Sequence, residues 1–285
     1  MTSQPIFRFA PSPNGWLHLG HAYSALYTDR AAKAMGGTML LRIEDIDTAR
    51  RKPEFVAGIF EDLQWLGLSW PQPVWFQSQR FPAYGEAAEK LRKRGLLYPC
   101  FCSRSEISAR ANGTDPEGAP FYPGTCRHLT KEQVGQRLAA GERAQWRLRM
   151  DEALVAGPMK IHVFAAGMNE KQQHEWQIAA NPARWGDVVL VRKDTPTSYH
   201  LSVVVDDAAQ GVTHVTRGMD LEAATDIHVL LQELLGLPSP FYAHHDLILD
   251  EERQKLSKSK GSQSLRDLRA AGWTAGEVRR RLGFE

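Results

Sequence analysis

The chain has 285 residues, of which 42% are hydrophobic and 24% charged, as is ordinary for a soluble globular protein. Its formal net charge of +2 is too small to indicate a nucleic-acid partner, so any RNA binding must come from local patches. No apolar run approaches the roughly 20 residues that span a bilayer, and the amino terminus lacks the basic and apolar segments of a secretory signal. We expect a cytoplasmic, monomeric protein with no membrane partner.

The first 43 residues predict a strand, a loop, a helix and a second strand. Residues 6–10 form an apolar run typical of a buried strand, and the Pro/Asn/Gly-rich residues 11–15 predict a loop. A helix is expected over 18–35, where two glycines end it, and a strand over 38–43. Strands that alternate with helices favour an α/β, Rossmann-like fold with a parallel sheet.

Two more helices are expected downstream, because Pro53 and Pro82 suit first turns and Gly67 and Gly95 suit helix ends. Apolar patterns resume at 187–192 and 199–205, which we predict as buried strands of the same sheet. In the last segment, Ser264 with Asp267 and Thr274 with Glu277 predict two capped helices.

We therefore expect a Rossmann-like domain made of 1–97 and 186–262, with an inserted subdomain over 98–185. Residues 263–285 are expected to form a short helical end. The stretches 105–120 and 165–183 within the insertion receive no assigned role.

The first motif with chemistry is His18-Leu-Gly-His21, where the loop after the first strand enters a helix. A helix amino terminus offers N–H groups and a positive dipole to phosphates. Gly20 would let a nucleotide approach the backbone, and the two imidazoles would supply hydrogen-bond donors. Read alone, the motif fits one helix-cap histidine and one surface histidine about as well as it fits a phosphate site.

The second motif is Lys255-Leu-Ser-Lys258-Ser, near the end of the chain. Alone, such a run is typical of a solvated loop. Together with the histidine motif, it indicates a lysine loop that closes on ATP phosphates, with Lys255 and Lys258 as ATP-binding residues. His18, His21 and Lys258 are the predicted catalytic residues.

These motifs occur with several others in one order along the chain. The others are Arg8-Phe-Ala-Pro-Ser-Pro-Asn-Gly, Leu41-Arg-Ile-Glu-Asp-Ile-Asp47, Thr197-Ser-Tyr-His-Leu201, Val204-Val-Asp-Asp207 and Thr213-His-Val-Thr-Arg217. Together they resemble the catalytic core of the glutamyl-tRNA synthetases, which are class I aminoacyl-tRNA synthetases. Because the sequence ends soon after the lysine loop, it is more similar to their truncated relatives, the glutamyl-Q tRNA(Asp) synthetases. The resemblance implies that 1–97 and 186–262 form the catalytic domain, and that 263–285 are a short helical end with no anticodon-binding domain.

The resemblance implies a glutamate pocket formed by Arg8, Phe9, Ala10, Pro11, Ser12, Glu44, Tyr199 and Arg217. The chemistry is consistent, since a ligand with two carboxylates and one ammonium group needs two cationic donors and one anion. The resemblance places Arg8 and Tyr199 on the side-chain carboxylate and Glu44 on the amino group.

Three clustered cysteines, Cys100, Cys102 and Cys126, suggest a structural Zn²⁺ site that lacks a fourth ligand. Both Tyr122 and His128 are close to Cys126 in the sequence. Imidazole is the better zinc ligand chemically, whereas the truncated family is known for a tyrosine at the position of Tyr122. The fourth ligand therefore stays open, as does the alternative of three unligated buried cysteines.

The resemblance implies that ATP, with Mg²⁺, activates glutamate to glutamyl-adenylate without tRNA. Glutamate then passes to queuosine in the anticodon of tRNA(Asp). Three alternatives stay open: a shortened conventional synthetase that charges a tRNA 3′ end, a small nucleotidylyltransferase, and a non-catalytic RNA-binding paralogue.

Overall fold

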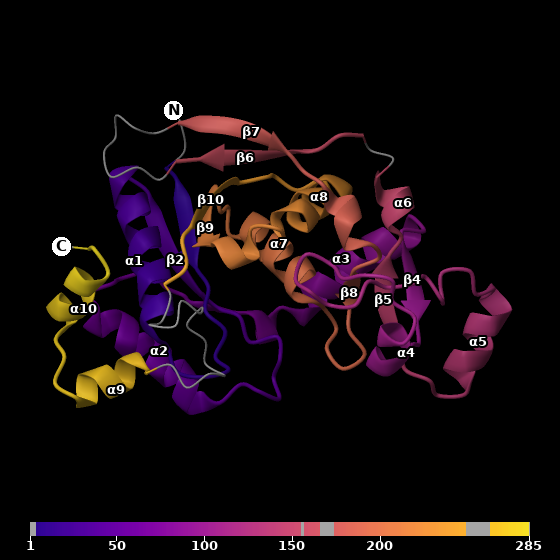
Figure 1. Cartoon of the computed structure of the whole chain (residues 1–285), viewed down its shortest axis with the longest axis horizontal. Helices are drawn as coiled ribbons and strands as arrows, with labels where there is room; N and C mark the ends of the chain where they lie inside the picture. Colours follow the sequence, from indigo (N-terminus) through magenta and orange to yellow (C-terminus); the bar gives the residue numbers. More distant parts are fainter. Residues whose placement is uncertain (1–3, 155–156, 166–173, 249–262, 285) are drawn as a thin grey trace.

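The computed structural model describes residues 4–154, 157–165, 174–248 and 263–284 (Figure 1). The chain begins as predicted, with strand β1 (Ile6–Phe9), helix α1 (Leu19–Ala34) and strand β2 (Thr38–Ile43). β1 and β2 pair in parallel, with Phe7 opposite Met39. After α1, Gly37 lies so close to Pro5 that a Cβ there would be 2.6 Å from the Pro5 carbonyl oxygen, so only glycine permits this return.

The central sheet continues on both sides of these strands. β3 (Trp75–Phe76) pairs in parallel with β2, and β9 (His214–Gly218) lies beside β1, where the Thr213 N–H donates to the Ile6 carbonyl over 2.9 Å. Beyond β9 the order is β10, β6, β7, in a second group of hydrogen-bonded strands. These strands are β6 (Lys160–Phe164), β7 (Glu175–Ala179) and β10 (Phe241–His245). All their pairings are parallel except that of β6 with β7, which matches the expected α/β class.

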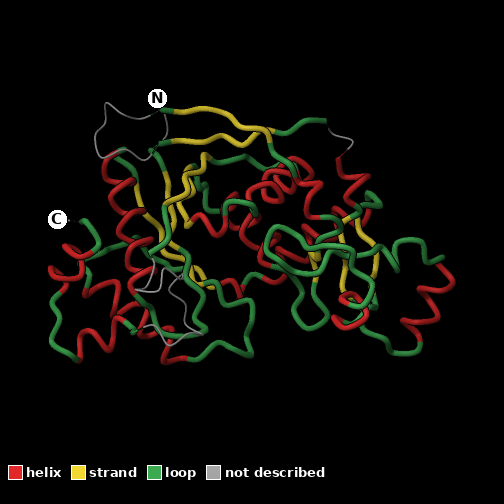
Figure 2. Tube along the Cα trace, in the orientation of Figure 1, coloured by secondary structure: helices red, strands yellow, loops and turns green. Residues whose placement is uncertain are grey.

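Besides α1, the described residues form four helices of 11 to 13 residues, which are among the red segments of Figure 2. They are α2 (Pro53–Trp65), α3 (Phe81–Lys93), α7 (Tyr199–Ala209) and α8 (Thr225–Leu235). The predicted helices at Pro53 and Pro82 are confirmed, each with proline in its first turn. α3, α7 and α8 share one hydrophobic core, while α1 and α2 share another with β1 and β2.

The prediction of a strand over 199–205 is wrong, because these residues begin helix α7. The run Leu-Ser-Val-Val-Val at 201–205 is almost entirely buried, whatever face of the helix each residue occupies. It therefore lacks the alternation of apolar and polar faces by which a helical period is recognised. The missed start signal is Ser198, whose side chain accepts a hydrogen bond from the Leu201 N–H.

The strand at 187–192 exists but belongs to a different sheet from the one predicted. β8 (Val189–Val191) pairs antiparallel with β5 (Gln145–Leu148), which in turn pairs with β4 (Leu97–Cys100). Periodicity within a strand does not encode its partner, so the sequence could not distinguish the two sheets.

The three strands β4, β5 and β8 lie at one end of the molecule with three short helices (Figure 1). These helices are α4 (Arg104–Ser108), α5 (Lys131–Ala139) and α6 (Met150–Ala153). The opposite end carries α9 (Leu265–Ala270) and α10 (Ala275–Arg281). Short 3₁₀ turns occur elsewhere in the chain, at Gln77–Gln79, Pro182–Trp185 and Met219–Leu221. The division of the chain at 97 and 186 stays a prediction.

Both predicted capping boxes, at Ser264 and Thr274, are confirmed. The two short helices dock on α2, where Arg269 forms an ion pair of 2.9 Å with the buried Asp62 and Arg279 donates to the Leu66 carbonyl. No helix in the described ranges is long and apolar enough to cross a bilayer.

Candidate active site and metal centre

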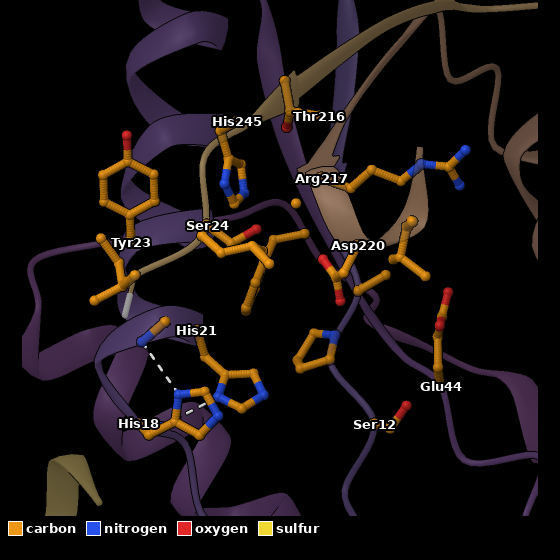
Figure 3. A pocket seen from close by; sticks show the side chains of 18 of the residues that line it. Ser12, His18, His21, Tyr23, Ser24, Glu44, Thr216, Arg217, Asp220 and His245 are labelled. Carbon is orange, nitrogen blue, oxygen red and sulfur yellow. Dashed lines mark hydrogen bonds between the residues drawn. The ribbon is translucent and has the colours of Figure 1, made fainter. Parts of the chain in front are cut away.

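One cavity of about 860 Å³ opens beside the carboxyl ends of β1, β2 and β9 (Figure 3). It brings together every predicted residue of the glutamate pocket and of the histidine motif that the structure describes. These are Arg8, Phe9, Ala10, Pro11, Ser12, His18, Gly20, His21, Glu44, Tyr199 and Arg217. In the view of Figure 3 the two histidines lie at one side, and Ser12, Glu44 and Arg217 lie at the other. The volume is suited to a ligand that joins an amino acid to a nucleotide.

His18 and His21 form a reciprocal cap at the start of α1. His18 Nδ1 accepts from the Gly20 N–H over 3.1 Å, and His21 Nδ1 accepts from the His18 N–H over 3.2 Å. Because each Nδ1 is an acceptor, a neutral ring carries its proton on Nε2. Two Nε2–H donors and the amino terminus of α1 therefore lie together, and together they form a candidate phosphate site.

The His18 ring provides a second reason why position 20 is glycine. A Cβ at this position would lie 3.0 Å from Cε1 and 3.2 Å from Nδ1 of the folded-back His18 ring. The glycine therefore makes room for the capping imidazole as well as for a ligand.

The lysine loop, with Lys255 and Lys258, lies outside the described residues. The segment that follows it is described and reaches the histidine motif. Ser264 forms an isolated antiparallel bridge with His18, and the Leu265 N–H donates to the Leu17 carbonyl over 2.8 Å. The chain after the lysine loop is thus attached at the histidine end of the cavity.

Two of the predicted glutamate-binding residues are held by a buried ionic network. Asp207 accepts from Arg8 Nε at 3.1 Å and from Arg42 Nη1 at 2.7 Å, and Arg42 also donates to Glu44 at 3.2 Å. Burial raises the pKa of the Asp207 carboxyl, but the two arginines outweigh this effect and lower the pKa. Burial raises the pKa of Glu44, despite the opposing charges of Arg42 and Arg8. The charge of Arg8 is therefore largely balanced by protein.

A second carboxylate, Asp206, extends this network away from the cavity. It accepts from Arg80 Nε at 2.6 Å, from Tyr84 Oη at 2.7 Å and from Gln77 Nε2 at 3.1 Å. Sequence reasoning assigned no role to Arg42, Asp206 or Asp207. The sequence did contain a signal for them, because each is a charged residue within an apolar run that is expected to be buried. A buried charge requires a partner inside the protein.

Arg217 is held differently, by neutral groups. Its Nη1 lies 3.0 Å from His228 Nδ1, its Nη2 donates to Thr225 Oγ1 at 2.6 Å, and its Nε donates to His244 Nε2 at 3.3 Å. Burial, followed by the charge of Arg217, lowers the pKa of His228 well below its ordinary value and that of His244 to about 3. Among the described residues no carboxylate forms an ion pair with Arg217. The arginine is fixed in place, yet its positive charge is left for a ligand.

The predicted metal ligands Cys100, Cys102 and Cys126 lie together, with all three Sγ atoms within 4.8 Å of one another. The Tyr122 hydroxyl lies beside this group, at 3.3 Å from Cys100 Sγ and 3.9 Å from Cys102 Sγ. The Sγ atoms of Cys102 and Cys126 are 3.5 Å apart, too far for a disulfide and close to an edge of a tetrahedral Zn²⁺ site.

The two candidate fourth ligands lie in different surroundings. Tyr122 is buried in the cysteine cluster, and its hydroxyl accepts from the Cys126 N–H at 2.8 Å, whereas His128 is exposed. The guanidinium of Arg147 lies 3.9 Å from the Tyr122 ring centroid. Burial raises the pKa of the Cys100 thiol, but hydrogen bonds from Tyr122 and Arg147 outweigh it and lower the pKa to about 7. Burial and the neighbouring sulfurs raise the pKa of Cys102 to about 11, so a metal ion that binds here would have to displace the proton of that thiol.

Comparison with known proteins places this geometry in a family. Residues 6–280 match the catalytic domain of the class I tRNA synthetases for glutamate and glutamine. The chain is 48% identical to the glutamyl-Q tRNA(Asp) synthetase of Rhodobacter capsulatus, covering 98% of this chain and 100% of the relative. It is 40% identical to that of Symbiobacterium thermophilum, covering 93% and 81%.

Among solved structures, the glutamate-tRNA synthetase of Elizabethkingia anophelis is similar, with a TM-score of 0.70 and 30% identity over 95% of this chain. The chain spans about half of that protein, covering 54% of its length. The residues of the cavity, the order of the motifs and the ligase-type relatives all indicate the same family. The chain therefore belongs to the class I aminoacyl-tRNA synthetases for glutamate and glutamine, and within them to the family of the glutamyl-Q tRNA(Asp) synthetases.

Proposed function

We propose that this protein activates glutamate with ATP, without tRNA, and transfers it to queuosine in the anticodon of tRNA(Asp). The observation that carries the proposal is a single cavity with two chemically distinct ends. One end has imidazole donors on a helix terminus, which suits the phosphates of ATP. The other holds Arg217, a rigid cation without a protein counter-ion in the described chain, which suits a carboxylate.

In the first step the α-carboxylate of glutamate attacks the α-phosphate of ATP and releases pyrophosphate. The carboxylate is already ionised at neutral pH, so no protein base is needed. His18, His21 and Lys258 would stabilise the charge that develops on the phosphates, with Lys255 helping to hold ATP. A bound Mg²⁺ would supply further charge neutralisation.

Glutamate recognition follows from the charges around the amino-acid end. Arg8 and Tyr199 would bind the side-chain carboxylate and Glu44 the ammonium group, with Arg217 adding the uncompensated positive charge. Because a site built around a charged guanidinium leaves that charge unpaired with a neutral amide, it should reject glutamine.

For the metal, we propose that Cys100, Cys102, Tyr122 and Cys126 hold a structural Zn²⁺. A complete set of protein ligands leaves no open position for substrate. Support comes from the distances among the three sulfurs and the Tyr122 hydroxyl.

Glutamate-dependent exchange of pyrophosphate into ATP, measured without tRNA, tests the first step. We expect exchange with glutamate and little with glutamine or aspartate; robust exchange with either of these but not with glutamate would contradict the proposal. The second step is tested by charging queuosine-containing tRNA(Asp) with labelled glutamate and digesting the RNA. Label on the anticodon nucleoside supports the proposal.

A second candidate is conventional charging of a tRNA 3′ end. It is favoured by the similarity to the glutamate-tRNA synthetase structure. Label on the 3′-terminal adenosine, and acceptance by transcripts that lack the modification, would support this alternative.

A further inference from the structure

One residue of the main cavity comes from the subdomain that holds the cysteine cluster. Among the described residues that line the cavity, Glu117 alone comes from between Arg50 and Tyr199 in the sequence. It lies in the stretch that received no role from the sequence. The metal-binding subdomain thus reaches into the candidate active site.

Glu117 stands at the tip of a closed hairpin, residues 113–121, which we call the Glu117 hairpin. The Phe121 N–H donates to the Gly113 carbonyl over 2.9 Å, and the Asp115 N–H donates to the Ala119 carbonyl over 2.8 Å. Inside the turn, Asp115 Oδ1 accepts from the N–H groups of Glu117 and Ala119, both at 2.9 Å. These bonds fix the backbone that presents Glu117.

The base of the Glu117 hairpin is anchored on two sides. The next residue, Tyr122, places its hydroxyl among the cysteine sulfurs. Phe121 packs on Gly186, where a Cβ would lie 2.6 Å from Phe121 Cζ. The hairpin is therefore clamped between the metal cluster and the turn that leads into β8, which makes Phe121 a positioning residue for Glu117.

The surroundings of Glu117 suit a proton acceptor. In the described chain its carboxylate has no hydrogen-bond or ion-pair partner. The Glu117 side chain is exposed overall, but partial desolvation of its carboxyl by neighbouring atoms, with the nearby charges of Asp115 and Asp220, raises its pKa above that of an ordinary glutamate. Glu117 and Asp220 both line the cavity, so a substrate bound there would lie beside the Glu117 carboxylate.

Of the two reaction steps, only the second requires a base. Activation starts from an ionised carboxylate, but transfer starts from a neutral hydroxyl group that must lose its proton. Resting on the proposed function, we infer that Glu117 is a catalytic residue of the transfer step. Its carboxylate takes the proton of the acceptor hydroxyl as that oxygen bonds to the carbonyl carbon of glutamyl-adenylate. The bond from this carbon to the phosphate oxygen breaks, and AMP leaves with the electron pair.

The test separates the two steps in the intact protein. For Glu117→Gln we expect the single-turnover transfer of glutamate from preformed adenylate to queuosine-containing tRNA(Asp) to slow by about 10²-fold or more. Pyrophosphate exchange should fall by less than about threefold. In the wild type, transfer should rise with pH as the carboxylate ionises, and this rise should vanish in the variant.

Two further variants control the result. Glu132→Gln removes an exposed glutamate from helix α5 of the same subdomain and should leave both rates unchanged. Phe121→Ala should slow transfer while keeping the pH-dependent rise, because Glu117 is displaced but still present. Zinc content and exchange activity report that each variant is folded.

Equal slowing of both steps in Glu117→Gln, or transfer at the wild-type rate, would overturn the inference. Absence of glutamate-dependent exchange in the wild type would instead refute the proposed function itself. The two failures are therefore distinguishable.

Discussion

Arg217 donates from Nη1 to Nδ1 of His228 over 3.0 Å, so a permanently charged guanidinium rests on a neutral imidazole. The contrast with Arg8, which is paired with Asp207, is central to the chemistry of the cavity. A neutral partner orients the arginine without cancelling its charge. In the proposed function, the electrostatic attraction for a substrate carboxylate would therefore come chiefly from Arg217.

This relationship predicts the effect of changing His228. His228→Asp would place a carboxylate beside Arg217, and we expect the KM for glutamate to rise about tenfold or more, or ~1.4 kcal/mol, with the KM for ATP little changed. His228→Asn keeps an acceptor near the Nδ1 position and should have a much smaller effect. Steady-state exchange kinetics with each substrate varied in turn measure both values. Equal effects of the two variants would contradict the argument from charge.

The metal site predicts about one zinc per chain, retained through gel filtration. Tyr122→Phe should lower zinc retention against a competing chelator, because it removes the hydroxyl that lies among the sulfurs. His128→Ala, which changes an exposed side chain, should retain zinc like the wild type. Elemental analysis of the wild type and both variants measures the zinc content per chain. The assignment of Tyr122 would be wrong if only the histidine variant lost the metal.

The lysine loop is expected to act in the transition state of activation. Lys258→Ala should lower the activation rate by about 10²-fold or more, with far smaller changes in the Michaelis constants. Pre-steady-state adenylate formation measures the rate directly. A loss confined to the KM for ATP would show that Lys258 holds the ground state instead.

His214, in the core, predicts a pH dependence of stability. Its ring stacks on Phe7 with centroids 4.9 Å apart, and burial lowers its pKa from 6.5 to about 4. Between these values the unfolded chain binds a proton that the native protein does not, so this histidine makes the free energy of unfolding fall as the pH falls. The shift corresponds to about 3 to 4 kcal/mol at most, because each pKa unit is about 1.4 kcal/mol.

The comparison with His214→Phe isolates this effect from that of other groups. Urea unfolding of both proteins at pH 7, 5.5 and 4.5 gives the difference in free energy at each pH. We expect the wild type to lose stability relative to the variant as the pH falls. A constant difference would mean that His214 titrates equally in both states.

The sequence alone determined the features that depend on nearby residues. The unit from Ile6 to Ile43, the proline-opened helices and the capping boxes at Ser264 and Thr274 all follow from propensities and hydrogen bonds within a few residues. The order of motifs also allowed the cavity residues to be named, since resemblance to a family does not require their spatial arrangement.

Only the tertiary structure decided relationships between distant residues. Helix α7 reads as a strand because packing buries nearly all its faces, and β8 pairs with β5 although its own pattern fits either sheet. The neutral partners of Arg217, the place of Tyr122 among the sulfurs, and the reach of Glu117 into the cavity depend on which segments meet in space. Burial keeps the histidines around Arg217 neutral, and burial is a property of the packed chain, not of the local sequence.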